Sequence, residues 1–513
     1  PPAWRLRSDR MFVDFRPTSR LRGAKAIDAA AAIGPVFEAL CEDSVDLAHL
    51  RMVCDWIQYR NNFRDVVDLR EILPPSYPGE AATSEPTRAD ELEIAIDLRR
   101  SADESQRSAL KATTRALLAA HRGEPSLPVD ERLVLEAWRP GRESCIWEFN
   151  RLYWQALDLW EKATGQMYES ALPGGESDAR NTAAVRELIR DMFSWWDQLA
   201  ARNALPDELY VVELGVGNGS QAKTWLDEFR VVEAEEGREY YRRLHYLMCD
   251  YSPHVLEMAR ENVAAHATRV SSFVLDATKP TTALAFLKYK VFLVYISNVY
   301  DNLPTDEVAR IDGRSYLVET RAYLPGPAAT ELSELVGTEV AALPGVIEKL
   351  LRLGPAVLAD ALPAVFATAD DSVDFWRRVW EGIRLEERYV PLTGLDLYPI
   401  APGVSGELLR PILESGGDIR MHVNNGAVAS FVDTLPLLHP YGRLLNHDLF
   451  ATDADRYRTG FLGPGKYDGS VVNWINGPLL TLVGSRKGFD VRFEPFRHRE
   501  GTNIVTMTAR VRD

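Results

Sequence analysis

The sequence predicts an α/β protein built on a doubly wound parallel sheet, with a helical extension before it and a helical insertion within it. Three observations point to this class. From residue 208, β-rich runs such as LYVVELG alternate with helical patterns such as SQAKTWLDEF, which is the rhythm of βαβ units. The first run ends in the glycine-rich turn VVELGVGNG at 211–219. Ala/Leu/Pro-rich sequence then interrupts the rhythm at about 325–415.

The length of 513 residues exceeds that of one ordinary domain, so we expect two or three units. We assign 1–200 to a mainly helical region that caps the site or binds a partner, and 201–513 to the doubly wound domain. Residues 144–200 are helical and rich in tryptophan. Such an aromatic stripe is typical of a core, and a lid over a ligand pocket is the alternative.

Charge and composition limit the possible functions. The chain has 59 Lys and Arg against 75 Asp and Glu, a net charge of −16, which argues against general nucleic-acid binding. There is no run of about 18 apolar residues and no apolar secretory signal at the N-terminus. The four cysteines form no CxxC pair, so we expect free thiols and no metal site. A cytoplasmic protein without a membrane segment is the expectation.

The glycine-rich turn at the end of the buried strand is typical of a ligand-binding turn. Glycines at a strand-to-helix turn let a ligand approach the backbone and the helix N-terminus closely. The spacing is E-x-G-x-G-x-G, from Glu213 through Gly215 and Gly217 to Gly219. It differs from the dinucleotide pattern G-x-G-x-x-G, and no G-K-[ST] of a P-loop follows. A nicotinamide-dependent oxidoreductase is therefore disfavoured, although it remains a competing interpretation.

The turn resembles motif I of the class I S-adenosylmethionine-dependent methyltransferases, and this resemblance implies their Rossmann-like sheet. In that family the acid and glycines meet the amino-acid portion and ribose of the cofactor. The second strand ends in an acid for the ribose hydroxyls, here Asp250 in LHYLMCDYSP, and the third in an acid near the adenine, here Asp276 in SSFVLDAT. The expected cofactor-binding residues are Glu213, Gly215, Gly217, Gly219, Asp250, Tyr251, Ser252, Asp276 and Ala277.

The chain is similar, over roughly 165–510, to the MidA-like methyltransferases. That family has an E-L-G-x-G-x-G turn, an acid two residues before a Ser-Pro, and an N-E-x-x-D-A-L-P segment after strand four. This chain has Asp250 before Ser252-Pro253, and the segment 301–304 reads DNLP. It departs from the family with Ser297-Asn298 in place of Asn-Glu, and with HDL at 447–449 in place of Asp-Tyr-Gly. The family includes an enzyme that methylates arginine, and the missing Glu weighs against that acceptor here.

The resemblance implies transfer of a methyl group from S-adenosylmethionine to a protein side chain or a small molecule. Such an enzyme holds the acceptor in line with the methyl group, and a base is needed where the acceptor must lose a proton. Asp301 is the first candidate for orienting or deprotonating the acceptor, with Tyr300 and Asn298 lining the site. A helix N-cap is the competing role for Asp301. His422 and His447 are further possible bases, although both fit hydrogen-bonded structural histidines.

A second functional hypothesis is an assembly or binding factor that keeps the fold and has lost methyl transfer. The altered segment after strand four and the long N-terminal extension allow it. Substitution of Asp301 separates the two hypotheses, because an assembly factor would be insensitive to it.

Overall fold

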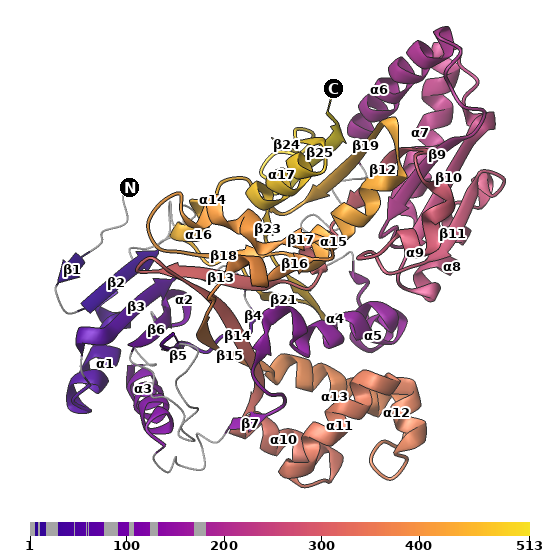
Figure 1. Cartoon of the computed structure of the whole chain (residues 1–513). Coiled ribbons are helices and arrows are strands. Elements are labelled where there is room, and N and C mark those ends of the chain that lie inside the picture. The colour runs from indigo at the N-terminus through magenta and orange to yellow at the C-terminus, as the bar shows by residue number, and fades with distance from the viewer. Residues whose placement is uncertain are drawn as a thin grey trace.

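The computed structural model places two large sheets side by side, with a helical lobe below them (Figure 1). The structure describes residues 6–8, 11–16, 29–45, 47–57, 59, 61–75, 91–101, 107–123, 132–168 and 181–512. Among these residues, no helix is both long and apolar enough to cross a membrane.

The first sheet is the predicted doubly wound sheet. Its seven strands run in the order β11-β10-β9-β12-β19-β25-β24. Their bounds are β9 Leu209–Leu214, β10 Leu244–Asp250, β11 Val270–Val274, β12 Val291–Ser297, β19 Leu438–Asp448, β24 Phe489–Pro495 and β25 Val505–Val511. The strands from β11 to β19 pair in parallel, and β25 is antiparallel to both of its neighbours. The chain order reverses between β9 and β12, which is where open α/β sheets bind ligands.

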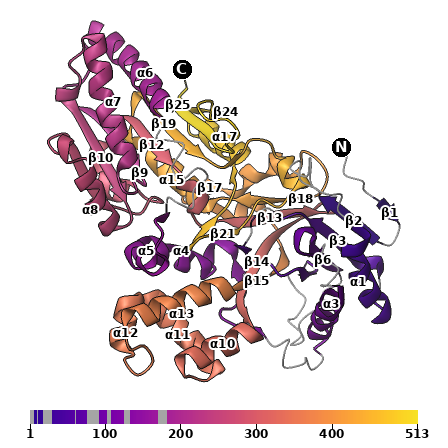
Figure 2. The same cartoon turned by 180° about the vertical axis from the view of Figure 1, so that it is seen from behind.

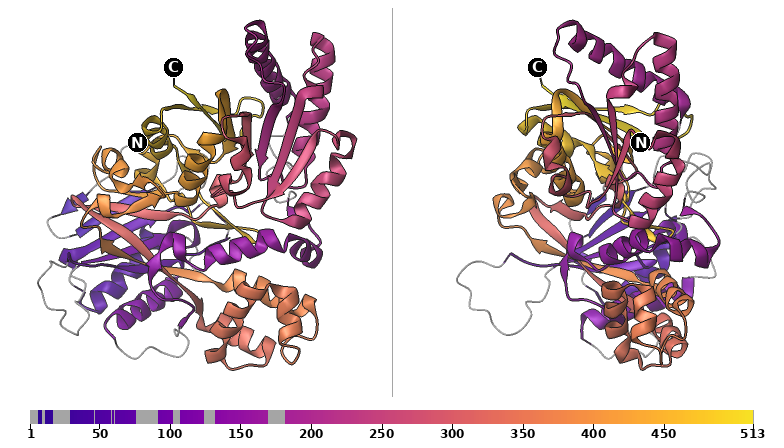
Figure 3. Two further views of the ribbon diagram at one scale, coloured as in Figure 1. Left: turned by 45° about the vertical axis from the view of Figure 1, so that its right-hand side comes forward. Right: turned by 90° about the vertical axis from the view of Figure 1, so that its right-hand side faces the viewer.

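Helices cover both faces of this sheet, as the side chains of β9 require (Figures 2 and 3). Leu209 and Val211 pack on one side with α6 (Thr182–Ala201), α7 (Ser220–Glu236) and α8 (Pro253–Asn262). Val212 and Leu214 pack on the other side with α15 (Asn425–Thr434) and α17 (Gly477–Arg486). Successive side chains of a strand point to opposite faces. A strand that is buried on both faces is therefore almost wholly apolar, as β9 is.

Helix α6 shows that the boundary predicted at residue 201 lies too late. Its buried residues, including Phe193 and Trp196, form one apolar cluster with α7 and with Val211 of β9. The helix begins at the N-cap Asn181, whose side chain accepts hydrogen bonds from Ala183 N and Ala184 N. The doubly wound domain therefore includes α6 and starts near residue 181.

The second sheet corrects the prediction of a mainly helical N-terminal region. Its order is β1-β2-β3-β6-β5-β15-β14-β13-β18, with β7 and β8 also paired to β14. The N-terminal strands are β1 Leu6–Ser8, β2 Met11–Arg16, β3 Leu50–Asp55, β5 Val67–Ile72, β6 Glu91–Asp97, β7 Arg132–Val134 and β8 Arg139–Pro140. The helices of this part are α1 Ala29–Glu42, α2 Leu98–Ser101, α3 Arg107–His121, α4 Ile146–Gln155 and α5 Leu157–Thr164. Charged residues such as Arg70 and Glu93 are buried in pairs inside these strands, so charged positions in their sequences do not mark a solvent-exposed face.

The insertion is larger than predicted and is not only helical. The helices α10 Gly326–Val336, α11 Leu343–Leu353, α12 Pro355–Ala361 and α13 Ala369–Gly382 lie within the predicted 325–415 and form the lobe in Figure 1. The insertion also supplies β13 Asp306–Ile311, β14 Arg314–Pro325, β15 Arg384–Pro391 and β18 Ile419–Val423 to the second sheet. It thus occupies the connection between β12 and the crossover helix α15, and it joins the N-terminal strands in one sheet.

Candidate functional site

The glycine-rich turn follows β9 at the carboxyl edge of the sheet and leads into α7. Gly215, Gly217 and Gly219 have φ angles of 74°, 56° and 80°, a region that residues with a Cβ rarely adopt. A Cβ at Gly215 would lie 2.3 Å from Val299 Cγ2, and one at Gly217 would lie 2.5 Å from the Tyr168 hydroxyl. A Cβ at Gly219 would lie 2.7 Å from Ala259 Cα. All three glycines are thus required both by the backbone and by close neighbours.

Glu213 lies beneath this turn. It is 2 % exposed, and its Oε2 accepts a 2.6 Å hydrogen bond from the Tyr246 hydroxyl. Burial raises the pKa of Glu213 to about 8. The Glu213 carboxyl group therefore serves as an internal support for the turn in this structure.

Asp250 ends β10 and fastens the turn to it. Its Oδ2 accepts a hydrogen bond from Gly217 N at 3.1 Å, and its Oδ1 accepts one from Ser252 N at 3.0 Å. Burial raises the pKa of Asp250 to about 6. Each carboxylate oxygen has a second acceptor position, so the group can still accept hydrogen bonds from a ligand.

The neighbours of Asp250 have mixed roles. The Ser252 hydroxyl accepts from Val255 N at 3.3 Å and caps α8, so its side chain is used locally. The Tyr251 hydroxyl accepts a 3.1 Å hydrogen bond from Gln155 of α4. This contact places α4 of the N-terminal region beside the expected cofactor-binding residues.

Asp276 and Ala277 follow β11 at the same edge. Asp276 Oδ1 accepts from Thr278 N at 2.9 Å and from the Thr278 hydroxyl at 2.7 Å. The Asp276 side chain is 38 % exposed, and its Oδ2 lies 3.6 Å from Lys279 Nζ. One carboxylate oxygen thus shapes the loop while the other faces a partly open surface.

The three catalytic candidates after β12 have different surroundings. Asn298 has a φ angle of 50°, and its backbone N–H donates to His447 O at 3.0 Å. Its side chain is partly exposed at the strand end. Tyr300 was expected to line the site, but its side chain is fully buried within the core cluster that includes Val308 and Phe431. Tyr300 is therefore a core residue in this structure.

Asp301 is 5 % exposed and forms a carboxyl pair with Asp448 at the end of β19. Asp448 is fully buried, and its Oδ2 accepts from Tyr300 N at 2.9 Å and from Val299 N at 3.2 Å. Its Oδ1 accepts from Leu449 N at 2.8 Å. Burial raises the pKa of both carboxyl groups, and two such groups in contact cannot both ionise readily. The pair therefore holds one proton near neutral pH.

Helices α4 and α5 cover this edge from the side of the helical lobe (Figures 1 and 2). Besides Gln155, Asn150 bridges two segments: its Nδ2 donates to Asn302 O at 2.9 Å, and its Oδ1 accepts from Val471 N at 2.9 Å. After α5, Tyr168 packs edge-on against Trp154, with ring centroids 5.7 Å apart, and its hydroxyl reaches the Gly217 turn. These contacts place α4, α5 and Tyr168 of the N-terminal region beside the glycine turn.

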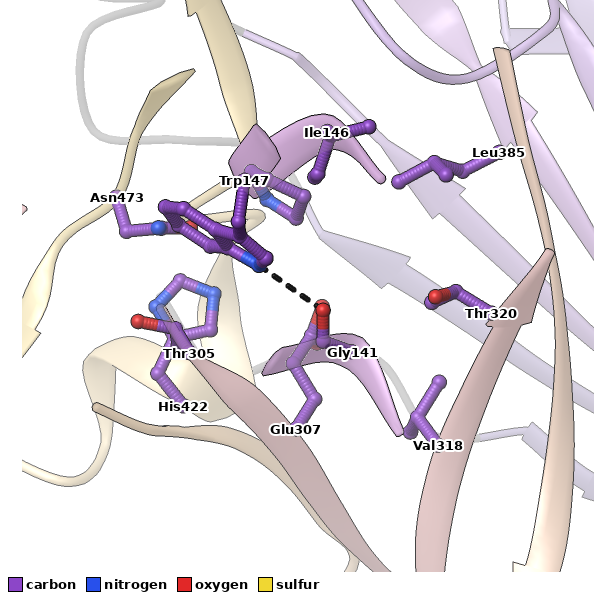
Figure 4. Close-up of a pocket in the computed structure, with 11 residues that line it drawn as sticks. Gly141, Ile146, Trp147, Thr305, Glu307, Val318, Thr320, Leu385, His422 and Asn473 are labelled. Carbon is purple, nitrogen blue, oxygen red and sulfur yellow. Dashed lines mark hydrogen bonds between the residues drawn. The ribbon is translucent and has the colours of Figure 1, made fainter. Parts of the chain in front are cut away.

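A cavity is lined by residues of the N-terminal region, the insertion and the segment 464–473 (Figure 4). The Trp147 indole N–H donates to Gly141 O at 2.9 Å on its wall, and the backbone N–H of Asn473 donates to Asp301 O at 2.9 Å. Its lining residues are Gly141, Ile146, Trp147, Thr305, Glu307, Val318, Thr320, Leu385, His422, Pro464 and Asn473. Through Asn473, the wall of this cavity is linked to the backbone of Asp301.

Both histidines that the sequence offered as bases have structural partners. His422 Nδ1 lies 2.8 Å from Trp474 O, and His447 Nδ1 lies 2.9 Å from the Thr506 hydroxyl. Sequence reasoning missed the pairing of Asp448 with Asp301 and the contact of Gln155 with Tyr251. The position of Asp448 at a predicted strand end was the available signal for the first, and no local pattern marked the second. Among the described residues, no cluster of three or more His, Cys, Asp or Glu could hold a metal ion.

Comparison with protein families supports this geometry. Residues 188–343 match a family described as "Putative S-adenosyl-L-methionine-dependent methyltransferase". The match runs from α6 through the glycine turn, Asp250, Asp276 and Asp301 into the insertion. No curated protein matches the chain.

Several solved structures are similar at low identity. A Burkholderia thailandensis protein bound to S-adenosyl-homocysteine has 14% identity and a TM-score of 0.41, with 79% of this chain and 92% of that chain covered. The CcbJ methyltransferase from Streptomyces caelestis has 11% identity and a TM-score of 0.27, with 65% of this chain and 95% of that chain covered.

The sheet topology and the glycine turn are those of the class I S-adenosylmethionine-dependent methyltransferase fold. The match places residues 188–343 in the S-adenosylmethionine-dependent methyltransferase family, and S-adenosylmethionine is its cofactor. The residues present fit this group, because glycine backbone at the switch point lies beside a carboxylate with remaining acceptor capacity.

Proposed function

We propose that this protein transfers a methyl group from S-adenosylmethionine to a protein side chain or a small molecule. One observation supports this proposal most directly. The glycine turn, which is hydrogen-bonded to Asp250 through Gly217 N, lies at one edge of the sheet. The carboxyl pair of Asp301 and Asp448 lies at neighbouring strand ends of the same edge. A cofactor site and a proton-accepting group at the same edge are what methyl transfer to a protonated acceptor needs.

Asp250 would accept the ribose hydroxyls, since its carboxylate oxygens each keep an acceptor position beside the glycine turn. Gly215, Gly217 and Gly219 would leave room for the cofactor against the backbone. Asp276 and the Ala277 backbone would border the adenine, and Tyr251 would close the site together with Gln155. Glu213 and Ser252 would act indirectly, the first by supporting the turn and the second by capping α8.

Asp301 would meet the acceptor, and the partly exposed Asn298 would orient it. When the acceptor loses its proton, that proton enters the carboxyl pair at Asp301 while the shared proton moves to Asp448. The pair passes from one proton to two, so no other base is required. When bound, S-adenosylmethionine supplies an electrophilic methyl group on its sulfonium, and displacement leaves a neutral thioether.

The proposal includes two finer assignments. The motifs around Asp250 and Asp301 favour a relative of the MidA-like methyltransferases, with an acceptor other than arginine because Asn298 stands at the family's Glu. The four cysteines are all free, which favours a reducing, cytoplasmic location.

Calorimetric titration with S-adenosylmethionine and S-adenosylhomocysteine tests the cofactor site first. We expect micromolar binding by the wild type and at least a tenfold loss in Asp250→Ala. The matched control is Asp207→Asn, whose carboxylate is fully exposed, and it should bind like the wild type. Equal binding by Asp250→Ala would remove the assigned role of Asp250.

Transfer itself is tested with methyl-labelled S-adenosylmethionine and a cell extract separated into macromolecules and small molecules. We expect label in one of the two fractions with the wild type and its loss with Asp301→Asn. If the wild type binds the cofactor and labels neither fraction, the proposed transfer activity is contradicted.

A further inference from the structure

The hairpin of β21 (Gly465–Tyr467) and β22 (Ser470–Val472) is fixed beside the segment that carries Asp301. Its second strand leads to Asn473, whose backbone N–H donates to Asp301 O at 2.9 Å. Asn150 of α4 ties the same strand to the residue after Asp301, since its side chain binds both Val471 N and Asn302 O. Figure 1 shows β21 beside α4. The hairpin therefore borders the proposed acceptor site.

Strand geometry directs the side chain of Tyr467 toward this site. The preceding Lys466 points to the helical lobe, where its Nζ donates to Trp380 O and Ile383 O. Neighbouring side chains in a strand point to opposite faces, so Tyr467 faces away from the lobe. Burial, and then the charge of Asp301, raise the pKa of Tyr467, so its phenol lies near the Asp301 carboxyl group. Tyr467 is only partly buried, and its ring can therefore meet a ligand.

Three aromatic donors hold the tip of the hairpin. Asp468 follows Tyr467, and its carboxylate accepts hydrogen bonds from the Tyr153 hydroxyl at 2.9 Å and from the Trp160 indole N–H at 3.1 Å. The carbonyl oxygen of Asp468 accepts from the Trp380 indole N–H at 2.7 Å. These donors are neutral, so they leave the negative charge of the carboxylate next to Tyr467 without compensation.

Aromatic side chains also connect the glycine turn to this hairpin. The Tyr168 hydroxyl lies 2.5 Å from the position of a Cβ at Gly217. Tyr168 packs edge-on against Trp154, with ring centroids 5.7 Å apart, and Trp154 packs in the same way against Tyr153 at 4.9 Å. Since Tyr153 holds the hairpin tip, a row of aromatic side chains runs from the cofactor turn to the strand that carries Tyr467.

The charge beside this row is negative. Asp301 and Asp448 together hold one proton and one negative charge, and Asp468 adds another carboxylate. Within the described part of the chain, no lysine or arginine forms an ion pair with any of the three. The exposed cations Arg151 and Lys279 act on expected cofactor-binding residues instead. Aromatic rings beside carboxylates attract a cation.

We propose that the methyl acceptor is an amine, bound as its ammonium ion against the ring of Tyr467 and beside Asp301. This inference rests on the proposed methyl transfer and names its substrate class. A neutral alcohol or phenol would not be attracted by the uncompensated charge, and an anion would be repelled. A guanidinium is also a cation, but its ordinary pKa lies above about 12, against about 10.4 for a lysine-type ammonium. The carboxyl pair therefore removes a proton more readily from the amine.

The transfer conserves protons and charge. The ammonium gives one proton to the carboxyl pair of Asp301 and Asp448, which passes from one proton to two. The free amine nitrogen then forms a bond to the methyl carbon while the carbon–sulfur bond of the sulfonium breaks. The sulfur keeps the bonding electron pair as a neutral thioether, and the methylated nitrogen carries the positive charge.

Selective acetylation of the cell extract tests whether the acceptor is an amine. Acetic anhydride followed by hydroxylamine leaves amines acetylated and restores phenols, whereas guanidines do not react. The treated extract is incubated with the full-length protein and methyl-labelled S-adenosylmethionine. The control extract receives anhydride that was hydrolysed beforehand. We expect at least tenfold less label in the acetylated extract, because acetylation removes the charge and the reactive electron pair of the amine.

The outcomes separate this inference from methyl transfer itself. Label that is unchanged by acetylation would overturn the amine and leave methyl transfer in place, with a hydroxyl or guanidine acceptor. No label in the control extract would contradict methyl transfer, and the amine acceptor with it.

Two substitutions test the contact with the ring of Tyr467. Tyr467→Phe keeps the ring and removes the hydroxyl, so the initial rate of labelling at limiting extract should stay within about twofold of the wild type. Tyr467→Leu removes the ring, and a rate about tenfold lower is expected. The affinity for S-adenosylmethionine should be unchanged in both variants, which verifies the fold. The matched control is Tyr441→Leu, at an exposed tyrosine near the start of β19, and it should keep the wild-type rate.

A wild-type rate in Tyr467→Leu would overturn the contact between the acceptor and this side chain. An equal loss in Tyr467→Phe and Tyr467→Leu would show that the hydroxyl binds the acceptor, and would overturn the binding of an ammonium on the ring.

Discussion

The carboxyl groups of Asp301 and Asp448 contact each other, and the backbone donors around them are unequal. Asp448 accepts hydrogen bonds from three backbone N–H groups, those of Val299, Tyr300 and Leu449. Asp301 accepts one side-chain hydrogen bond, from Asn302 Nδ2 at 2.7 Å. Donors stabilise the ionised form of a carboxyl group, so Asp448 carries the charge and Asp301 the shared proton.

This assignment predicts unequal effects of two conservative substitutions on stability. In Asp301→Asn, the amide still donates to Asp448, so the free energy of unfolding should stay within about 1 kcal/mol of the wild type. In Asp448→Asn, backbone donors face an NH2 group in place of a carboxylate oxygen, and a loss of roughly 2–3 kcal/mol is expected. Urea denaturation at pH 7 measures both. The reverse order of stabilities would place the proton on Asp448.

The same pair predicts a specific loss of catalysis. Asp301→Asn cannot take up the acceptor's proton, so kcat should fall by about 10²–10⁴, while the affinity for S-adenosylmethionine stays unchanged. Asp312→Asn, an exposed carboxylate, is the control and should keep the wild-type kcat. If Asp301→Asn retains kcat, the residue is only structural.

The raised pKa of Glu213 predicts that the free energy of unfolding depends on pH. Its pKa is raised by burial to about 8, from an ordinary value of 4.5. Between these two pH values the unfolded chain is ionised and the folded chain stays protonated, so rising pH lowers the free energy of unfolding by ~1.4 kcal/mol per pH unit. Glu213→Gln imitates the protonated form and lacks this dependence.

Denaturation of wild type and Glu213→Gln at pH 5.5 and 7.5 checks this expectation. The stability of the variant relative to the wild type should rise by roughly 2–3 kcal/mol between the two pH values. The exposed Glu208→Gln is the control, and its difference from the wild type should not change. A constant difference for Glu213→Gln would mean that Glu213 is already ionised at pH 5.5.

Lys466 connects the segment 464–473 to the helical lobe. Its buried Nζ donates to Trp380 O at 2.6 Å, Ile383 O at 2.7 Å and Glu381 O at 3.1 Å, at the end of α13. Lys466→Met keeps the apolar stem but leaves three carbonyl groups without this donor. We expect a loss of about 2–4 kcal/mol in the free energy of unfolding, against almost none for the exposed Lys349→Met. Equal stability of the two variants would contradict this role.

The sequence predicted the parts of the fold that depend on local patterns. The turn at 215–219 and the strand ends at Asp250, Asp276 and Asp301 follow from apolar runs and glycine spacing within about 90 residues. The doubly wound sheet is confirmed for that reason. Buried strands of this sheet are apolar on both faces, and their helices have clear periodicity.

The second sheet and the acid pair could not be predicted in this way. Strand β5 pairs with β15, which is more than 300 residues further along the chain, as in the pair Ile72 and Tyr389. Inside this sheet, Arg70 and Glu93 are buried and neutralise each other, so their polarity suggested exposed helical or loop sequence. Likewise, Asp448 acquires its role only through a contact with Asp301 across the whole insertion.

Gly217 and Tyr168 provide the sharpest test of the cap over the cofactor turn. In Gly217→Ala, the alanine must adopt a φ of 56°, and its Cβ would lie 2.5 Å from the Tyr168 hydroxyl. The substitution therefore has two costs, backbone strain of about 1 kcal/mol and a steric conflict with the cap. Gly237→Ala is a matched control at the end of α7, since its φ of 65° is similar and no atom of the residues that the structure describes lies within 4 Å of the new Cβ.

Tyr168→Phe removes the conflicting hydroxyl and separates the two costs. We expect Gly217→Ala to weaken S-adenosylmethionine binding at least tenfold, Gly237→Ala to leave it unchanged, and the double variant Gly217→Ala/Tyr168→Phe to recover part of the loss. Titration calorimetry of the four proteins of this cycle gives the coupling, expected at about 1 kcal/mol because residues in contact are non-additive. Strict additivity would mean that Tyr168 moves away from the turn when the cofactor binds, and α5 would then not form part of the closed site.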